Sequence, residues 1–97
     1  MAYKIKWSFK AVAHLEQICN FIAHDSEFYA ALFAKRIISI VKSIPRFPKA
    51  GRKVPEYNNE NLREKIYKNY RIVYRIKKEA IEIAAICHGS KPLANLF

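Results

Sequence analysis

The apolar positions at the start of the chain change from alternation to helical spacing. Tyr3, Ile5 and Trp7 alternate with polar residues, which predicts a short strand over residues 3–8 with these three side chains on one face. Ser8 then offers an N-cap for a helix that begins near Phe9. Apolar residues recur in that helix at steps of three and four: Val12, Leu15, Ile18, Cys19 and Ile22.

A second helix is predicted over residues 27–44. Asp25-Ser26 interrupts the first pattern and offers another N-cap, and Pro45 ends the second helix because proline cannot continue a helix interior. The apolar stripe consists of Tyr29, Phe33, Ile37, Ile40, Val41 and Ile44. The short connection predicts an antiparallel helical hairpin.

The second half of the chain alternates in three runs. Residues 46–61 contain Pro48, Gly51 and Pro55 and are predicted to be a loop. Strands are then predicted over residues 62–67, 70–77 and 80–88, joined by the two-residue turns Lys68-Asn69 and Lys78-Glu79. We therefore predict one α+β domain over residues 1–97. Its helical hairpin packs on one face of an antiparallel sheet that ends in a three-stranded meander.

The strand faces predict a basic surface. On the middle strand, Tyr70, Ile72, Tyr74 and Ile76 point to the hairpin, so Arg71 and Arg75 point away from it. When each strand is considered separately, Ile81, Ile83, Ala85 and Cys87 face the core with Glu64. Arg63, Lys65, Ile86 and His88 then join the two arginines on the open face, and Lys91 follows just beyond. Such a face suits a phosphate backbone, an acidic partner peptide or plain solvent.

Composition narrows the function classes. The chain has 97 residues, a formal net charge of +10 and 52% hydrophobic residues, so it is no disordered basic tail. The charge predicts an anionic partner. No apolar run reaches the roughly 18 residues of a membrane span, and no signal peptide is visible, so we expect a cytoplasmic protein without membrane contacts.

Residues that would hold a metal or cofactor are not arranged for it. Cys19 and Cys87 form no disulfide framework, and His14, His24 and His88 lack zinc-site spacing. The glycines form no phosphate loop. We therefore expect neither a metal nor a cofactor.

Four segments carry a resemblance to a known family. They are Phe-Pro-Lys-Ala-Gly-Arg at residues 47–52, Asn-Leu-Arg-Glu at 61–64, Tyr-Arg-Ile-Val-Tyr-Arg-Ile at 70–76 and residues 83–91. With the order of the elements, they make nearly the whole chain similar to the RelE/ParE superfamily, the small toxins of type II toxin–antitoxin pairs. The resemblance implies that a cognate antitoxin is the partner in a hetero-oligomer. An acidic or amphipathic segment of this antitoxin would cover the sheet or the hairpin.

The RelE branch implies a ribosome-dependent endonuclease that cuts mRNA on a basic sheet face. Carried over to this chain, Arg71, His88 and Lys65 become the catalytic candidates. The wider RNA- or target-binding set is Arg63, Lys65, Arg71, Arg75, His88 and Lys91. Phe97 falls where that branch has a tyrosine, and it has no hydroxyl that could transfer a proton. A carboxylate base would come from Glu56, Glu60 or Glu64.

The ParE branch implies inhibition of DNA gyrase by protein–protein contact. The long hairpin, the Pro-Gly-Arg loop and the His88-Gly89 ending are more similar to this branch. Growth arrest by gyrase inhibition is therefore the first functional hypothesis, and the mRNA endonuclease is the second. A basic nucleic-acid-binding module without toxic activity is the third.

Overall fold

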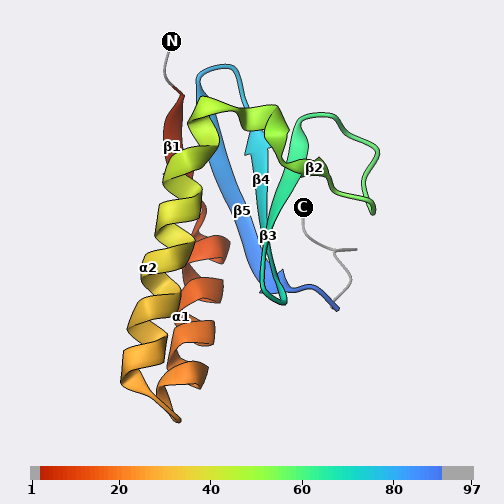
Figure 1. Cartoon of the computed structure of the whole chain (residues 1–97). Coiled ribbons are helices and arrows are strands. Elements are labelled where there is room, and N and C mark those ends of the chain that lie inside the picture. The colour runs from red at the N-terminus through yellow and green to blue at the C-terminus, as the bar shows by residue number, and fades with distance from the viewer. Residues whose placement is uncertain (1–2, 91–97) are drawn as a thin grey trace.

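The computed structural model describes residues 3–90, which form two helices against one five-stranded sheet (Figure 1). The elements are β1 (Lys4–Trp7), α1 (Phe9–Ala23), α2 (Glu27–Ser43), β2 (Arg52–Lys53), β3 (Leu62–Tyr67), β4 (Tyr70–Ile76) and β5 (Ala80–His88). The 3-10 helices Ile44–Arg46 and Pro48–Ala50, like β2, lie in or next to the predicted loop. None of the helices in this part of the chain is long and apolar enough to span a bilayer.

The helices begin at the predicted caps. Ser8 Oγ accepts a hydrogen bond from the Ala11 amide at 3.0 Å, and Ser26 Oγ accepts one from the Tyr29 amide at 3.2 Å. The two helices lie side by side on one face of the sheet, and the turn between them projects past its end (Figure 1). The predicted hairpin is confirmed.

The sheet has the strand order β1-β5-β4-β3-β2. The predicted meander of β3, β4 and β5 is confirmed, with both pairs antiparallel. The sheet as a whole is mixed, because β1 runs parallel to β5, with Ile5 beside Ile81 and Trp7 beside Ile83. The long connection from β1 to β5, which contains both helices and the other three strands, allows this parallel pairing.

Apolar residues are buried on both faces of the sheet. The helix-covered face holds the main core, including Phe33, Ile37, Val41, Ile72, Tyr74, Ile81, Ile83 and Ile86. The opposite face, here called the open face, holds a smaller cluster: Val54, Leu62, Val73, Ala84 and Ala85. Val54 belongs to the loop after β2, so this loop covers part of the open face.

Candidate functional site

The β3–β4 register places the predicted cations on two faces of the sheet. Arg63 pairs with Tyr74 and Lys65 pairs with Ile72, so both cations lie on the helix-covered side. Arg71 and Arg75 lie on the open face. The prediction that these four cations share one face is wrong. Tyr67 is the β3 residue that packs against the main core on that side, so Arg63 and Lys65 lie outside this core.

A β-bulge reverses the end of β5. Val73 pairs with Ala85 but Tyr74 pairs with Ile83, so Ala84 is the extra residue. Ile86 and His88 therefore face the helix-covered side, while Ala85 and Cys87 face the open side, the reverse of the prediction for all four. His88 lies opposite Tyr70, not beside Arg71.

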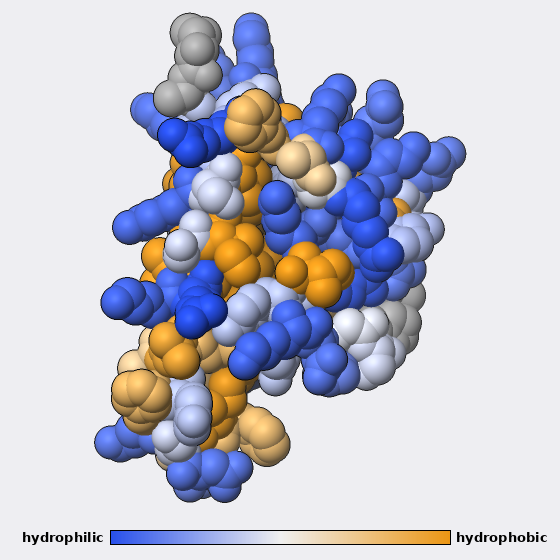
Figure 2. All heavy atoms as spheres, viewed as in Figure 1, coloured by the Kyte–Doolittle hydropathy of each residue, from blue (hydrophilic) through white to orange (hydrophobic). Residues whose placement is uncertain are grey.

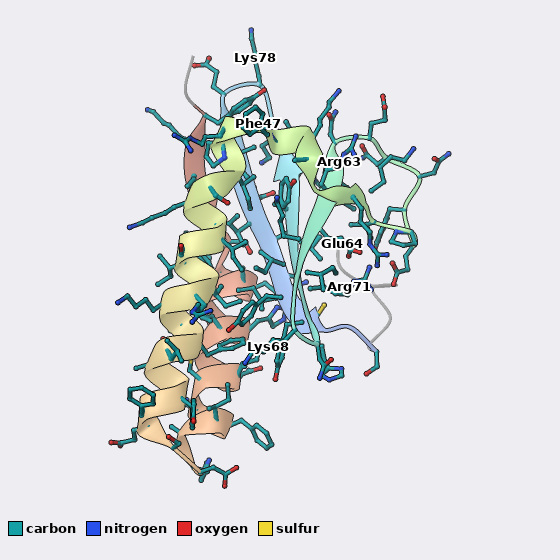
Figure 3. The ribbon with its side chains drawn as sticks, viewed as in Figure 1. Phe47, Arg63, Glu64, Lys68, Arg71 and Lys78 are labelled. Carbon is teal, nitrogen blue, oxygen red and sulfur yellow. The ribbon has the colours of Figure 1, made fainter. Side chains whose placement is uncertain are left out.

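Arg71 is held in an ion-pair network on the open face, in which Arg71 and Glu64 are buried while Glu56 and Arg52 reach solvent (Figure 3). Its side chain is 5% exposed, and Nε donates to Glu64 Oε1 at 2.6 Å. Nη1 and Nη2 donate to the two carboxylate oxygens of Glu56 at 2.8 and 2.7 Å. Glu64, itself fully buried, also accepts from Nε of Arg52. Hydrogen bonding to Glu56 raises the pKa of Arg71, although burial acts in the opposite direction.

The positive and negative charges within this network balance each other. Two guanidinium groups meet two carboxylates, and the donors of Arg71 are directed at protein oxygens. The pairing with Glu56 also fastens the loop between β2 and β3 onto β4. Arg71 therefore has a structural role, because its positive charge is neutralised by Glu56 and Glu64 and not left for a bound phosphate.

Arg63 fastens a second loop. Its Nε donates to the Glu60 carbonyl at 2.7 Å, and Nη1 donates to the carbonyl of Gly51 at 3.1 Å and that of Lys49 at 3.4 Å. Its cross-strand neighbour Tyr74 donates from Oη to the Pro48 carbonyl at 2.5 Å. Burial raises the pKa of Tyr74, which keeps this phenol a donor. Two strands thus hold residues 48–51 in one conformation.

The other predicted site residues have different surroundings. Lys65 and Arg75 are half-buried, and Lys91 lies outside the described residues. His88 is exposed, and its Nδ1 lies 2.8 Å from Ser90 Oγ. A cavity of about 280 Å³ at the β3–β4 turn has His88, Arg71, Arg52 and Lys68 in its lining. Of the catalytic candidates, the structure thus brings Arg71 and His88 to one cavity and leaves Lys65 apart.

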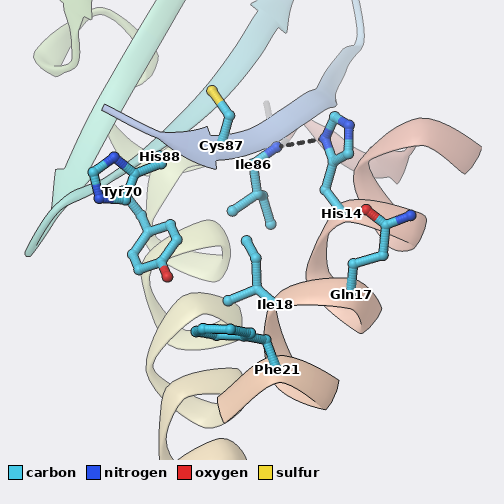
Figure 4. Close-up of a pocket in the computed structure, with 8 residues that line it drawn as sticks. All are labelled: His14, Gln17, Ile18, Phe21, Tyr70, Ile86, Cys87 and His88. Atoms are coloured by element: carbon cyan, nitrogen blue, oxygen red, sulfur yellow. Dashed lines mark hydrogen bonds between the residues drawn. The ribbon is translucent and has the colours of Figure 1, made fainter. Parts of the chain in front are cut away.

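A more apolar groove lies between α1 and the end of β5 (Figure 4). Its volume is about 360 Å³, and its lining includes the apolar or aromatic side chains of Ile18, Phe21, Tyr70 and Ile86. The Ile86 amide donates to Nδ1 of His14 at 3.2 Å. Because β1 pairs with β5 only as far as Ile83, no described strand flanks this part of the β5 edge. The groove therefore lies beside a stretch of β5 that no described strand covers, although His14 and Ser8 already bond the Ile86 amide and the Ala84 carbonyl there.

The sequence carried a signal that strand-by-strand assignment missed. Residues that flank a two-residue hairpin turn pair with each other, so Tyr67 and Tyr70 must share a face. This parity places Glu64 on the face of Arg71 and removes Arg63 and Lys65 from it. Within residues 3–90, no group of three His, Cys, Asp or Glu side chains is arranged to hold a metal ion.

Comparisons with known proteins agree with this fold. Over 90% of this chain and 96% of the other, the structure is similar to a protein of the chromosomal ParDE toxin–antitoxin system from P. aeruginosa, with 21% identity and a TM-score of 0.74. A protein of the RelBE2 toxin–antitoxin complex from Mycobacterium tuberculosis is 15% identical, with a TM-score of 0.63 over 91% of this chain and 99% of the other. Both likenesses show a shared fold. A comparison with curated proteins gave no match.

The sequence itself decides the family. Residues 5–93 match the model of the ParE toxin of the type II toxin–antitoxin system, parDE. That match includes both helices and all five strands apart from the first residue of β1. The chain therefore belongs to the ParE family of type II toxin–antitoxin toxins.

Proposed function

We propose that this toxin arrests growth by inhibiting DNA gyrase through protein–protein contact. The observation that carries the proposal is the closed network around Arg71. A nuclease of the RelE kind needs unpaired cations directed at the scissile phosphate, because they stabilise charge that develops in the transition state. Here Arg71 is 5% exposed and donates to Glu56 and Glu64.

The division of cations between two faces supports the same proposal. Arg63 and Lys65 lie across the sheet from Arg71, and Arg63 is engaged with loop carbonyls. A binding-type toxin needs a surface of suitable shape and charge and no convergent catalytic set. The high positive charge then serves contact with an acidic protein surface.

The test is a supercoiling assay with purified toxin and reconstituted DNA gyrase. We expect supercoiling to fall as toxin is added, and we expect Arg71→Lys, where it folds, to inhibit as well as the wild type. No inhibition at a large molar excess of folded toxin would remove gyrase as the target.

The cavity that holds His88 favours the ribosome-dependent mRNA endonuclease as the second candidate. An exposed imidazole stands there with Arg52 and Lys68, which suits proton transfer beside a phosphate. In this case His88→Ala should abolish mRNA cleavage on translating ribosomes while the free energy of unfolding stays unchanged. Cleavage that survives this substitution would exclude His88 as a catalytic residue.

The cognate antitoxin is the expected partner in either case. The two structurally similar proteins come from toxin–antitoxin systems, and the groove offers an apolar surface beside a part of β5 that no described strand covers. Both a helix in the groove and an added strand would suit it. We expect the pair to form a hetero-oligomer in the cytoplasm, where gyrase and ribosomes are found.

A further inference from the structure

An aromatic side chain is held exposed at the end of the sheet opposite the β3–β4 turn. Phe47 is 72% exposed and lies between the two 3-10 helices. Figure 3 places Phe47 at this end of the molecule, and Figure 2 shows, in the same view, apolar residues there with hydrophilic residues around them. Exposure of a single phenylalanine is ordinary by itself, so the argument depends on its surroundings.

A cavity of about 520 Å³ opens beside Phe47. Apolar lining comes from Tyr3 and Ile76, and Arg46 and Lys49 stand in the same lining. Within the described residues, neither of these two exposed cations forms an ion pair with a carboxylate, and no carboxylate lines the cavity. We name this set of five residues the Phe47 surface.

The backbone beneath the Phe47 surface is fixed by hydrogen bonds from distant strands. Arg63 holds the Lys49 carbonyl and Tyr74 holds the Pro48 carbonyl, while the Phe47 carbonyl accepts from the Ala50 amide at 2.9 Å. Phe47 itself lies between Arg46 and Pro48, and both 3-10 helices carry a proline in their first turn. A rigid aromatic loses little conformational entropy on binding, which is typical of residues that dominate an interface.

The Phe47 surface is also separate from the groove beside β5. Tyr70 lines that groove and Ile76 lines the cavity beside Phe47, at opposite ends of β4. Six residue steps of about 3.3 Å place them roughly 20 Å apart along the strand. One chain can therefore present two surfaces to two different partners.

We propose that the Phe47 surface is where this toxin docks its cellular target, an acidic segment with an apolar anchor residue. The apolar residue enters the cavity against Phe47, and carboxylates of the same segment meet Arg46 and Lys49. This inference rests on the proposed function, under which the acidic segment belongs to DNA gyrase. The antitoxin would then bind the groove between α1 and the end of β5.

The test compares Phe47→Ala and Lys49→Glu with Phe28→Ala. Phe28 is a matched control, because it is 71% exposed and lies at the other end of α2. We expect both variants of the Phe47 surface to bind purified gyrase at least about 10-fold more weakly and to lose growth arrest in cells. Phe28→Ala should arrest growth like the wild type, and thermal unfolding should show all three folded.

Four results would overturn the inference. Phe47→Ala could arrest growth as fully as the wild type, or it could lose affinity for the cognate antitoxin by the same factor as for gyrase. Sedimentation could show a wild-type dimer that Phe47→Ala makes monomeric, which would assign the surface to a second copy. A wild-type chain that arrests no growth would remove the toxin function and this surface together.

The proposal of gyrase as the target and the proposal of the Phe47 surface as the docking site can be refuted independently. If the wild type arrests growth without inhibiting supercoiling, gyrase is excluded as the target. Growth arrest by the Phe47→Ala and Phe28→Ala variants still decides the surface in that case, because this readout names no target.

Discussion

The two faces of the sheet bury side chains by different means. On the helix-covered face, Ile72, Ile83 and their neighbours pack against the hairpin. On the open face, Arg71 and Glu64 are just as inaccessible, but they stay charged and depend on each other. Loss of one methyl group from an apolar core lowers the stability of the fold by a modest amount. Loss of one partner from a buried ion pair lowers it more, because the other charge stays buried without its partner. The same sheet should therefore respond very differently to changes on its two faces.

Glu64→Gln should have the largest effect. It leaves the Arg71 guanidinium buried with one of its two partners neutral, and loss of a partner from a buried pair costs about 3–5 kcal/mol. Urea unfolding measures the change. The control is Glu82→Gln, which breaks the partly exposed pair with Lys77 and should cost less than about 1 kcal/mol. Equal losses in both variants would contradict the contrast between the two faces.

Gly51→Ala should follow in size. A Cβ at this position would collide with Oη of Tyr74 and would lie 2.8 Å from the Glu64 carbonyl oxygen, so the loop must move. We expect a loss of about 1–3 kcal/mol in the free energy of unfolding. Adding Tyr74→Phe removes one of the two clashing atoms and should recover part of this loss in a double-mutant cycle. Strict additivity would show that the clash with Tyr74 is not the cause.

Ile83→Val tests the helix-covered face. It removes one methylene from a side chain that is fully buried against the hairpin, which costs about 0.5–1.5 kcal/mol. Chemical denaturation measures this loss. A cost as large as that of Glu64→Gln would mean that the two faces do not differ in the way described.

High pH should produce the smallest effect, through Tyr74. Burial raises its folded-state pKa above the ordinary value of 10.0, so the folded protein holds this proton more tightly than the unfolded chain does. The stabilisation is fully present below pH 10 and is lost as the pH rises through the folded-state pKa. One proton limits the slope to about 1.4 kcal/mol per pH unit. Unfolding profiles of wild type and Tyr74→Phe should diverge in this window, and parallel profiles would refute the assignment.

Local patterns were sufficient to predict most of the fold. Ser8 and Ser26 begin the two helices as predicted, because an N-cap acts only on the next turn of the same segment. Lys68-Asn69 joins β3 and β4 for a similar reason. β2 was not predicted, since Arg52 and Lys53 show no alternation and pair only because β3 lies beside them.

The candidate site was predicted less well. Arg71 and His88, two of the predicted site residues, line one cavity, but the partners that define their surroundings were not predicted. Glu56 lies 15 residues from Arg71 and reaches it only through the fold of the loop. The bulge at Ala84 depends on how β5 packs against β4 and the hairpin, and no glycine or other turn-forming residue in β5 indicates it in the sequence.

The sequence by itself determined both α-helices, the four longer strands, their order and the family, because periodicity, caps and turns depend on neighbouring residues. Only the tertiary structure decided which cations are available. A strand shows which residues alternate, but a pairing partner and a bulge decide which face each residue joins. Arg63 and Arg71 therefore look like binding residues in the sequence and hold loops in the folded chain. Arg46 and Lys49 beside Phe47 are among the exposed cations that form no ion pair within residues 3–90.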